Sequence, residues 1–102
     1  MSGARPAFGR ALNLPALARS AAGEPIAVPG WPLSVQHLLG PRTVEGTHGA
    51  WLVVMSGEAI VDLPGGDFRV LKAGDALSFP AGAAATLRNV AVPAILVWHV
   101  GG

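Results

Sequence analysis

The chain has 102 residues, of which 51% are hydrophobic and 13% charged, and its formal net charge is +1. This length allows one domain with one modest core, while the low charge and the lack of a basic run argue against nucleic acid and acidic membranes as partners. The absence of cysteine excludes disulfides, thiolate zinc sites and cysteine nucleophiles. No apolar run approaches the roughly 18–20 residues that cross a bilayer, so we expect a cytoplasmic protein.

Residues 1–32 predict a short arm and an edge strand that pack on the main domain. Leu12 to Ala18 can form one helical turn, with Asn13 as its N-cap and Gly23 as its end. Ile26 to Val28 can form a short strand, which the prolines around it confine to an edge or loop.

Residues 33–102 predict an all-β domain of short strands separated by closely spaced turns. Turn signals fall at Gly40-Pro41, Ser56-Gly57, Pro64 to Asp67, Gly74-Asp75 and Pro80 to Gly82. Such spacing is typical of a sandwich or barrel. The unusually apolar composition predicts a homodimer. The expected strands are Leu33–Leu39, Arg42–Glu45, Trp51–Met55, Ala59–Leu63, Phe68–Leu71, Leu77–Phe79, Thr86–Val90 and Ala94–Val100.

Gly74, Pro80, Gly82 and Asn89 resemble the second sequence motif of the cupin superfamily, whose members are small jelly-roll barrels. That motif reads Gly, five residues, Pro, one residue, Gly, two residues, His, three residues, Asn. All four residues fall in register here, and the histidine position is Ala85. The resemblance covers about residues 33 to 100 and implies a cupin-type jelly-roll β-barrel.

The first cupin motif is similar to the segment that ends at Gly57. Counting back from this glycine, the motif's glutamate falls on Ala50 and its histidine pair falls near Val44 to Gly46. In a metal-binding cupin, three histidines and this glutamate hold a divalent ion. Glu45 and His48 alone fall short of the three protein ligands that a stable site needs. The resemblance therefore implies that the inherited metal site is lost, with a divalent metal kept as the alternative.

His48 and Glu45 are candidate ligand contacts at the mouth of the barrel. If strand alternation extends back from Trp51, then His48, Ala50, Leu52 and Val54 share one face. His48 would then contact a ligand or transfer a proton, and otherwise it is an exposed loop histidine. Glu45 would accept a hydrogen bond or act as a base, and otherwise it is a surface carboxylate.

His37 and His99 each lie in an expected strand, and the alternation leaves their direction open. His37 alternates with Gln36, and His99 alternates with Trp98. In each pair one side chain faces inward. A metal site outside the family pattern, built from His37, His48, Glu45 and His99, is conceivable because imidazole and carboxylate suit many metals.

The leading hypothesis is a metal-free cupin-type protein that binds a small, largely apolar or weakly anionic ligand or serves as an interaction module. The alternative is a small metal-dependent enzyme, an isomerase, dioxygenase or decarboxylase, that uses repositioned histidines. A third hypothesis is the sensory domain of a regulatory system. The expected ligand site at the barrel mouth comprises Glu45, His48, Ala50, Ala85, His37 and His99.

Overall fold

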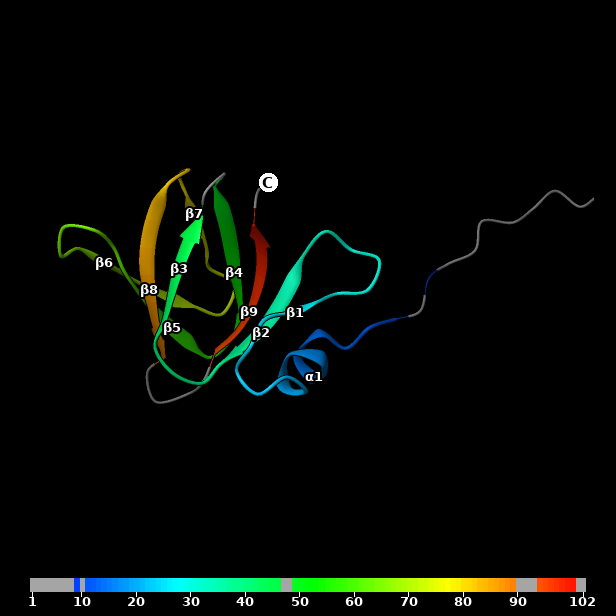
Figure 1. The fold of residues 1–102 in the computed structure, drawn as a ribbon. Coiled ribbons are helices and arrows are strands. Elements are labelled where there is room, and N and C mark those ends of the chain that lie inside the picture. Colours follow the sequence, from blue (N-terminus) through cyan, green and yellow to red (C-terminus); the bar gives the residue numbers. More distant parts are fainter. Residues whose placement is uncertain (1–8, 10, 47–48, 90–93, 101–102) are drawn as a thin grey trace, which may run out of the picture.

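The computed structural model of the chain describes residues 9, 11–46, 49–89 and 94–100, with the side chains of residues 45, 46, 89 and 100 left aside. Within these residues one short helix is followed by nine strands (Figure 1). No helix in the described part is long and apolar enough to cross a membrane. The elements are α1 (Leu14–Arg19), β1 (Ile26–Ala27), β2 (Ser34–Leu38), β3 (Arg42–Gly46), β4 (Ala50–Ser56), β5 (Glu58–Asp62), β6 (Phe68–Lys72), β7 (Ala76–Phe79), β8 (Ala83–Asn89) and β9 (Ala94–Val100).

The strands form two antiparallel sheets that face each other. One sheet has the order β1-β2-β9-β4-β7, and the other has the order β3-β8-β5-β6. Strands β2 and β3 follow each other in the chain but lie in different sheets, as do β4 and β5. This crossing between sheets closes the apolar interior and confirms the predicted jelly-roll architecture.

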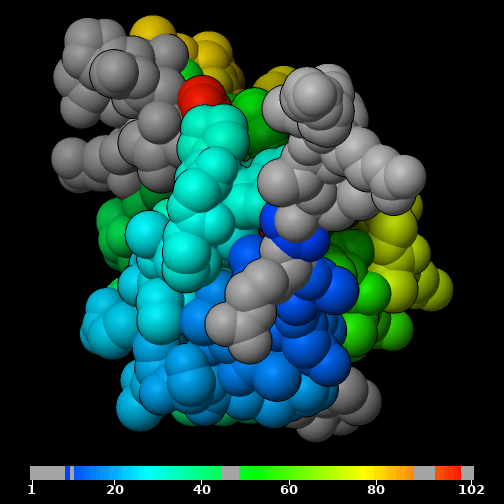
Figure 2. All heavy atoms as spheres, turned by 90° about the vertical axis from the view of Figure 1, so that its right-hand side faces the viewer, coloured from blue at the N-terminus to red at the C-terminus, as the bar shows by residue number. Residues whose placement is uncertain are grey.

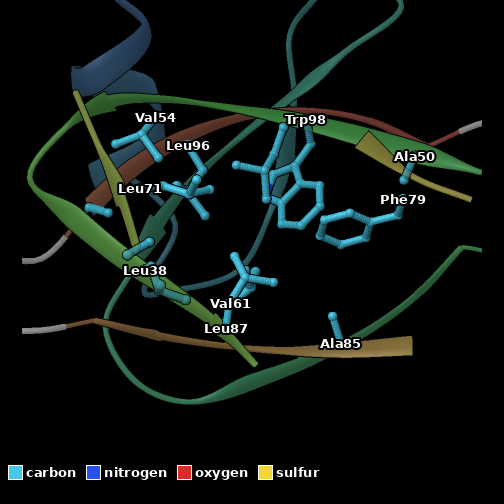
Figure 3. Close-up of a cluster of buried hydrophobic side chains, with 13 residues drawn as sticks. Leu38, Ala50, Val54, Val61, Leu71, Phe79, Ala85, Leu87, Leu96 and Trp98 are labelled. Carbon is cyan, nitrogen blue, oxygen red and sulfur yellow. The ribbon is translucent and has the colours of Figure 1, made fainter. Parts of the chain in front are cut away.

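The interior between the sheets holds one group of buried apolar side chains, which we call the inner cluster (Figure 3). On β4 the predicted alternation is confirmed, because Ala50, Leu52 and Val54 all point inward. Burying a leucine or valine fully stabilises the fold by roughly 1.5–3 kcal/mol. The inner cluster comprises Leu38, Ala50, Leu52, Val54, Ala59, Val61, Leu71, Phe79, Ala85, Leu87, Ala94, Leu96 and Trp98.

Helix α1 covers part of the outer face of the five-stranded sheet, and Figure 2 shows it beside the segment that leads through β1 to β2. The predicted N-cap is confirmed, since Oδ1 of Asn13 accepts a hydrogen bond of 3.0 Å from the backbone N–H of Ala16. Ala18 is fully buried against Val35 and Ile95, which point outward from β2 and β9. The early part of the chain therefore seals one side of the sheet.

Two boundaries differ from the sequence expectation. Helix α1 ends at Arg19, where Ser20 takes the C-cap position, while the predicted end, Gly23, forms a later turn at φ +82°. Strand β8 begins at Ala83, within the alanine run where the turn at Gly82 also predicts a start, and so before the expected Thr86, because its early alanines pair with β3. Pairing with a neighbouring strand overrides the low strand propensity of alanine.

Candidate functional site

Ala50 and Ala85 both point into the barrel, from β4 and β8. Ala50 lies opposite Phe79 of β7, and Ala85 lies opposite Val44 of β3. Each of the two alanines is 7% exposed. These are the positions where the resemblance expects a glutamate and a histidine, and a methyl group supplies no ligand atom.

Two aromatic rings occupy the interior beside Ala50 (Figure 3). The rings of Phe79 and Trp98 meet edge to face, with centroids 5.9 Å apart and planes at 86°. This arrangement is a favoured geometry for aromatic pairs. These neighbouring rings take up the space beside the small Ala50 side chain.

Open space remains at the other alanine. A pocket of about 310 Å³ lies between the end of β7, the start of β8 and the β5–β6 hairpin, and we call it the mouth pocket. Its wall is almost entirely apolar. The lining residues are Leu63, Pro64, Ser78, Phe79, Pro80, Ala83, Ala84 and Ala85.

His37 and His99 lie outside the barrel interior. His99 stacks on Trp51, with ring centroids 5.6 Å apart, and Trp51 points away from the inner cluster. His37 is opposite Ile95 on β9, four residues from His99. At the usual rise of a strand, the two histidines are about 13 Å apart along the sheet. Since metal–ligand bonds are only about 2 Å long, they cannot share an ion.

The remaining candidates are Glu45 and His48. The backbone of Glu45 pairs with Ala84 beside the mouth pocket, while His48 lies outside the described residues. Among the residues that the structure describes, no three His, Asp or Glu side chains come together in a way that could hold a metal ion. The described residues around Ala50 and Ala85 therefore do not supply the three histidines and the glutamate of a metal-binding cupin.

Sequence reasoning left open whether Gln36 or His37 faces the barrel interior, and in the structure it is Gln36. Gln36 is 1% exposed, and its Oε1 accepts a hydrogen bond of 2.9 Å from the indole N–H of Trp98. Its Nε2 donates a hydrogen bond of 3.0 Å to the carbonyl oxygen of Gly23. Alternation along β2 shows that Gln36 and His37 lie on opposite faces of the strand. Helix α1 covers the face that carries Val35 and His37, so Gln36 faces the interior.

An ion pair lies on the outer face of the four-stranded sheet, away from the interior. Arg88 binds Asp62 through two hydrogen bonds, Nε to Oδ2 at 2.5 Å and Nη2 to Oδ1 at 3.0 Å. These hydrogen bonds hold the pKa of Asp62 below its ordinary value of 3.8, because they stabilise the charged carboxylate. Arg88 is thus engaged with a partner of its own chain.

The backbone is similar to several solved structures. Hydroquinone 1,2-dioxygenase from a Sphingomonas species, with 4-hydroxybenzoate bound, aligns with a TM-score of 0.73 at 20% identity over 85% of this chain and 71% of that chain. A cupin-2 domain containing protein from Shewanella frigidimarina aligns with a TM-score of 0.72 at 13% identity, over 88% and 94%. An uncharacterized conserved protein with a double-stranded β-helix domain from Klebsiella pneumoniae aligns with a TM-score of 0.68 at 26% identity, over 89% and 88%.

Neither the family models nor the curated proteins include a match to this sequence.

Proposed function

Because the chain has the cupin fold, we propose that it binds a small, uncharged and largely apolar molecule in the mouth pocket without using a metal ion. The observation that carries this proposal is the pocket of about 310 Å³ beside Ala85. This volume lies near the lower end of ligand pockets, which span roughly 300–1,000 Å³. The wall of this pocket is almost entirely apolar, so the ligand would be a largely apolar body.

The composition of the pocket wall supports an uncharged ligand over the weakly anionic one that the sequence left open. The described lining residues include no Lys or Arg, and burying an unpaired charge is costly. The hydroquinone dioxygenase that aligns with this chain holds 4-hydroxybenzoate, which supports an aromatic ring as part of the ligand.

The test is a titration with phenol and toluene, followed by amide chemical shifts in NMR. We expect saturable shifts at Ala83 and Ala85, with much weaker effects from benzoate because it is charged. Ala85→Leu fills the pocket and should abolish them. Ala76→Leu adds the same side chain at an exposed position of β7 and should leave binding intact. Ala83→Leu, at a partly buried lining position, is a second blocking variant should Ala85→Leu not fold.

A result in which no probe gives saturable shifts, or in which both blocking variants bind normally, contradicts the proposal. Calorimetric titration with nickel, manganese, iron(II) and zinc tests the metal-free part. Stoichiometric, tight binding of any of these ions would favour the enzyme alternative, which then requires His48, because His37 and His99 lie too far apart.

We also propose that a second copy of the chain covers the exposed part of the five-stranded sheet. Trp51 and Met55 are 37% and 38% exposed there, and they point outward from β4 beside the Trp51–His99 stack. A two-fold interface places a patch against itself, so it must be free of like charges. This outer patch meets that condition, and its residues are Trp51, Val53, Met55, Ala76, Ser78 and His99.

A further inference from the structure

A second pocket lies on the opposite side of the barrel from the mouth pocket. It has a volume of about 290 Å³ and sits where the chain passes from β2 in one sheet to β3 in the other, and we call it the edge pocket. The two pockets share no lining residue. The edge pocket is lined mainly by polar atoms, from Ala22, Gly23, Glu24, Gln36, Leu38, Leu39, Gly40, Pro41 and Arg42.

Two of these residues, Gln36 and Arg42, carry polar side chains at strand positions that face the interior. Gln36 alternates with Leu38, a member of the inner cluster, and Arg42 alternates with Val44, which packs against that cluster. Among the described residues, Gln36 is the one polar side chain that is buried. An interior otherwise built from apolar side chains therefore has one polar corner, at the edge pocket.

Gln36 retains hydrogen-bonding capacity. A side-chain amide offers two N–H donors and two carbonyl lone pairs. Within the described part of the chain, Gln36 uses one lone pair for Trp98 and one N–H for Gly23. One donor and one acceptor remain for a molecule in the edge pocket.

Arg42 shows which chemistry the pocket recognises. Its guanidinium pairs with the carboxylate of Glu24, which comes from the loop between α1 and β1. The Arg42 side chain is 28% exposed and the Glu24 side chain is 72% exposed. Such a solvent-exposed partner adds little stability. A free carboxylate that enters the pocket can therefore replace Glu24 at small cost and take both donors of the guanidinium fork.

We propose that the edge pocket binds a small carboxylate. The guanidinium of Arg42 pairs with the carboxylate group of the ligand, and a free N–H of Gln36 donates a hydrogen bond to it. Glu24 competes with the ligand for Arg42. This site is independent of the proposed ligand in the mouth pocket. The two ligands also differ chemically. The mouth pocket favours an uncharged apolar molecule, whereas the edge pocket favours an anion with hydrogen-bonding oxygens.

The test is an NMR titration of the full chain with sodium acetate and sodium succinate, against sodium chloride at the same ionic strength. The indole N–H of Trp98 is the reporter, because its acceptor Gln36 lines the pocket. We expect saturable shifts of this signal and of Arg42 with the carboxylates but not with chloride. Equal shifts with chloride would overturn the proposal.

Variants of the ion pair sharpen the test. Arg42→Gln should weaken acetate binding about tenfold, the effect of one charge-assisted hydrogen bond. Glu24→Gln removes the competitor and should tighten binding roughly two- to fivefold. Arg69→Gln is the matched control, since Arg69 forms a similar exposed pair with Asp67 on the β5–β6 hairpin.

Unchanged binding in Arg42→Gln, or no tightening in Glu24→Gln, would contradict the assignment. Glu24→Gln alters only an exposed loop side chain, so it decides the question even if Arg42→Gln does not fold. Ala85→Leu separates the two sites: it should block phenol in the mouth pocket and leave acetate binding unchanged. If Ala85→Leu abolishes the acetate shifts, the ion binds in the mouth pocket and the proposal fails.

Discussion

The indole N–H of Trp98 donates a hydrogen bond of 2.9 Å to Oε1 of Gln36, although the two residues are 62 positions apart in the sequence. The pair joins β9 to β2 inside the barrel. The Trp98 ring also meets Phe79, which lines the mouth pocket, while Gln36 lines the edge pocket. One buried pair of side chains thus lies between the two candidate sites.

Removal of either partner of this hydrogen bond should destabilise the fold, and the effects of the two substitutions should not be additive. Gln36→Leu leaves the Trp98 N–H unpaired, and we expect about 1–3 kcal/mol of lost stability. Trp98→Phe leaves Oε1 unpaired and also removes buried volume, so about 2–4 kcal/mol is expected. Urea unfolding of the single and double variants measures the coupling. The double variant should be at least about 1 kcal/mol more stable than the sum of the single effects predicts, and strict additivity would contradict the account.

The turn at Gly74 should not tolerate a side chain. Gly74 has φ +93°, and its N–H donates a hydrogen bond of 2.7 Å to the carbonyl oxygen of Val54. Gly74→Ala should cost about 1–2 kcal/mol, because residues with a Cβ are strained in this region. Gly40→Ala is the control, since Gly40 has open space around it and no such φ, and it should change stability by less than about 0.5 kcal/mol. Thermal unfolding compares the two, and equal losses would rule out strain as the cause.

The Asp62–Arg88 pair should contribute to stability in a pH-dependent way. The pKa of Asp62 is lowered in the folded state by its hydrogen bonds to Arg88. A carboxyl with a lowered folded pKa stabilises the fold above its unfolded pKa, and this contribution disappears as the pH falls through the folded value. Asp62→Asn should therefore be slightly less stable than the natural chain near pH 7, and the difference should vanish at the most acidic pH. A thermal unfolding series in low salt, repeated at high salt to screen the pair, checks this. A difference that grows on acidification would contradict it.

The outer patch should determine the oligomeric state. Trp51→Glu places two like charges at a self-facing surface and should convert a dimer into a monomer. Trp31→Glu is the matched control, because Trp31 is 63% exposed but lies in the β1–β2 connection. Sedimentation velocity across a wide range of protein concentration gives the mass. A natural chain that remains monomeric, or a dimer that only Trp31→Glu disrupts, would exclude this interface.

The sequence predicted which segments form most of the strands and where the turns between them lie, because both depend on local chemistry. Gly74 and Gly82 supply φ values that other residues rarely adopt, and Pro80 fixes the intervening corner. The carboxylate of Asp75 accepts a hydrogen bond of 2.8 Å from the Lys72 N–H, consistent with the turn role predicted from sequence. Alternation also predicted that Ala50, Leu52 and Val54 share one face, as they do.

The tertiary structure decided what the interior contains. Alternation could not tell whether Trp98 or His99 faces inward, because both faces of β9 are apolar. That choice depends on α1, which covers the outer side, and on Phe79 and Gln36, which are distant in sequence and contact Trp98 across the barrel. The turns at Gly74 and Gly82 follow from single residues, whereas the mouth and edge pockets arise only where several strands meet.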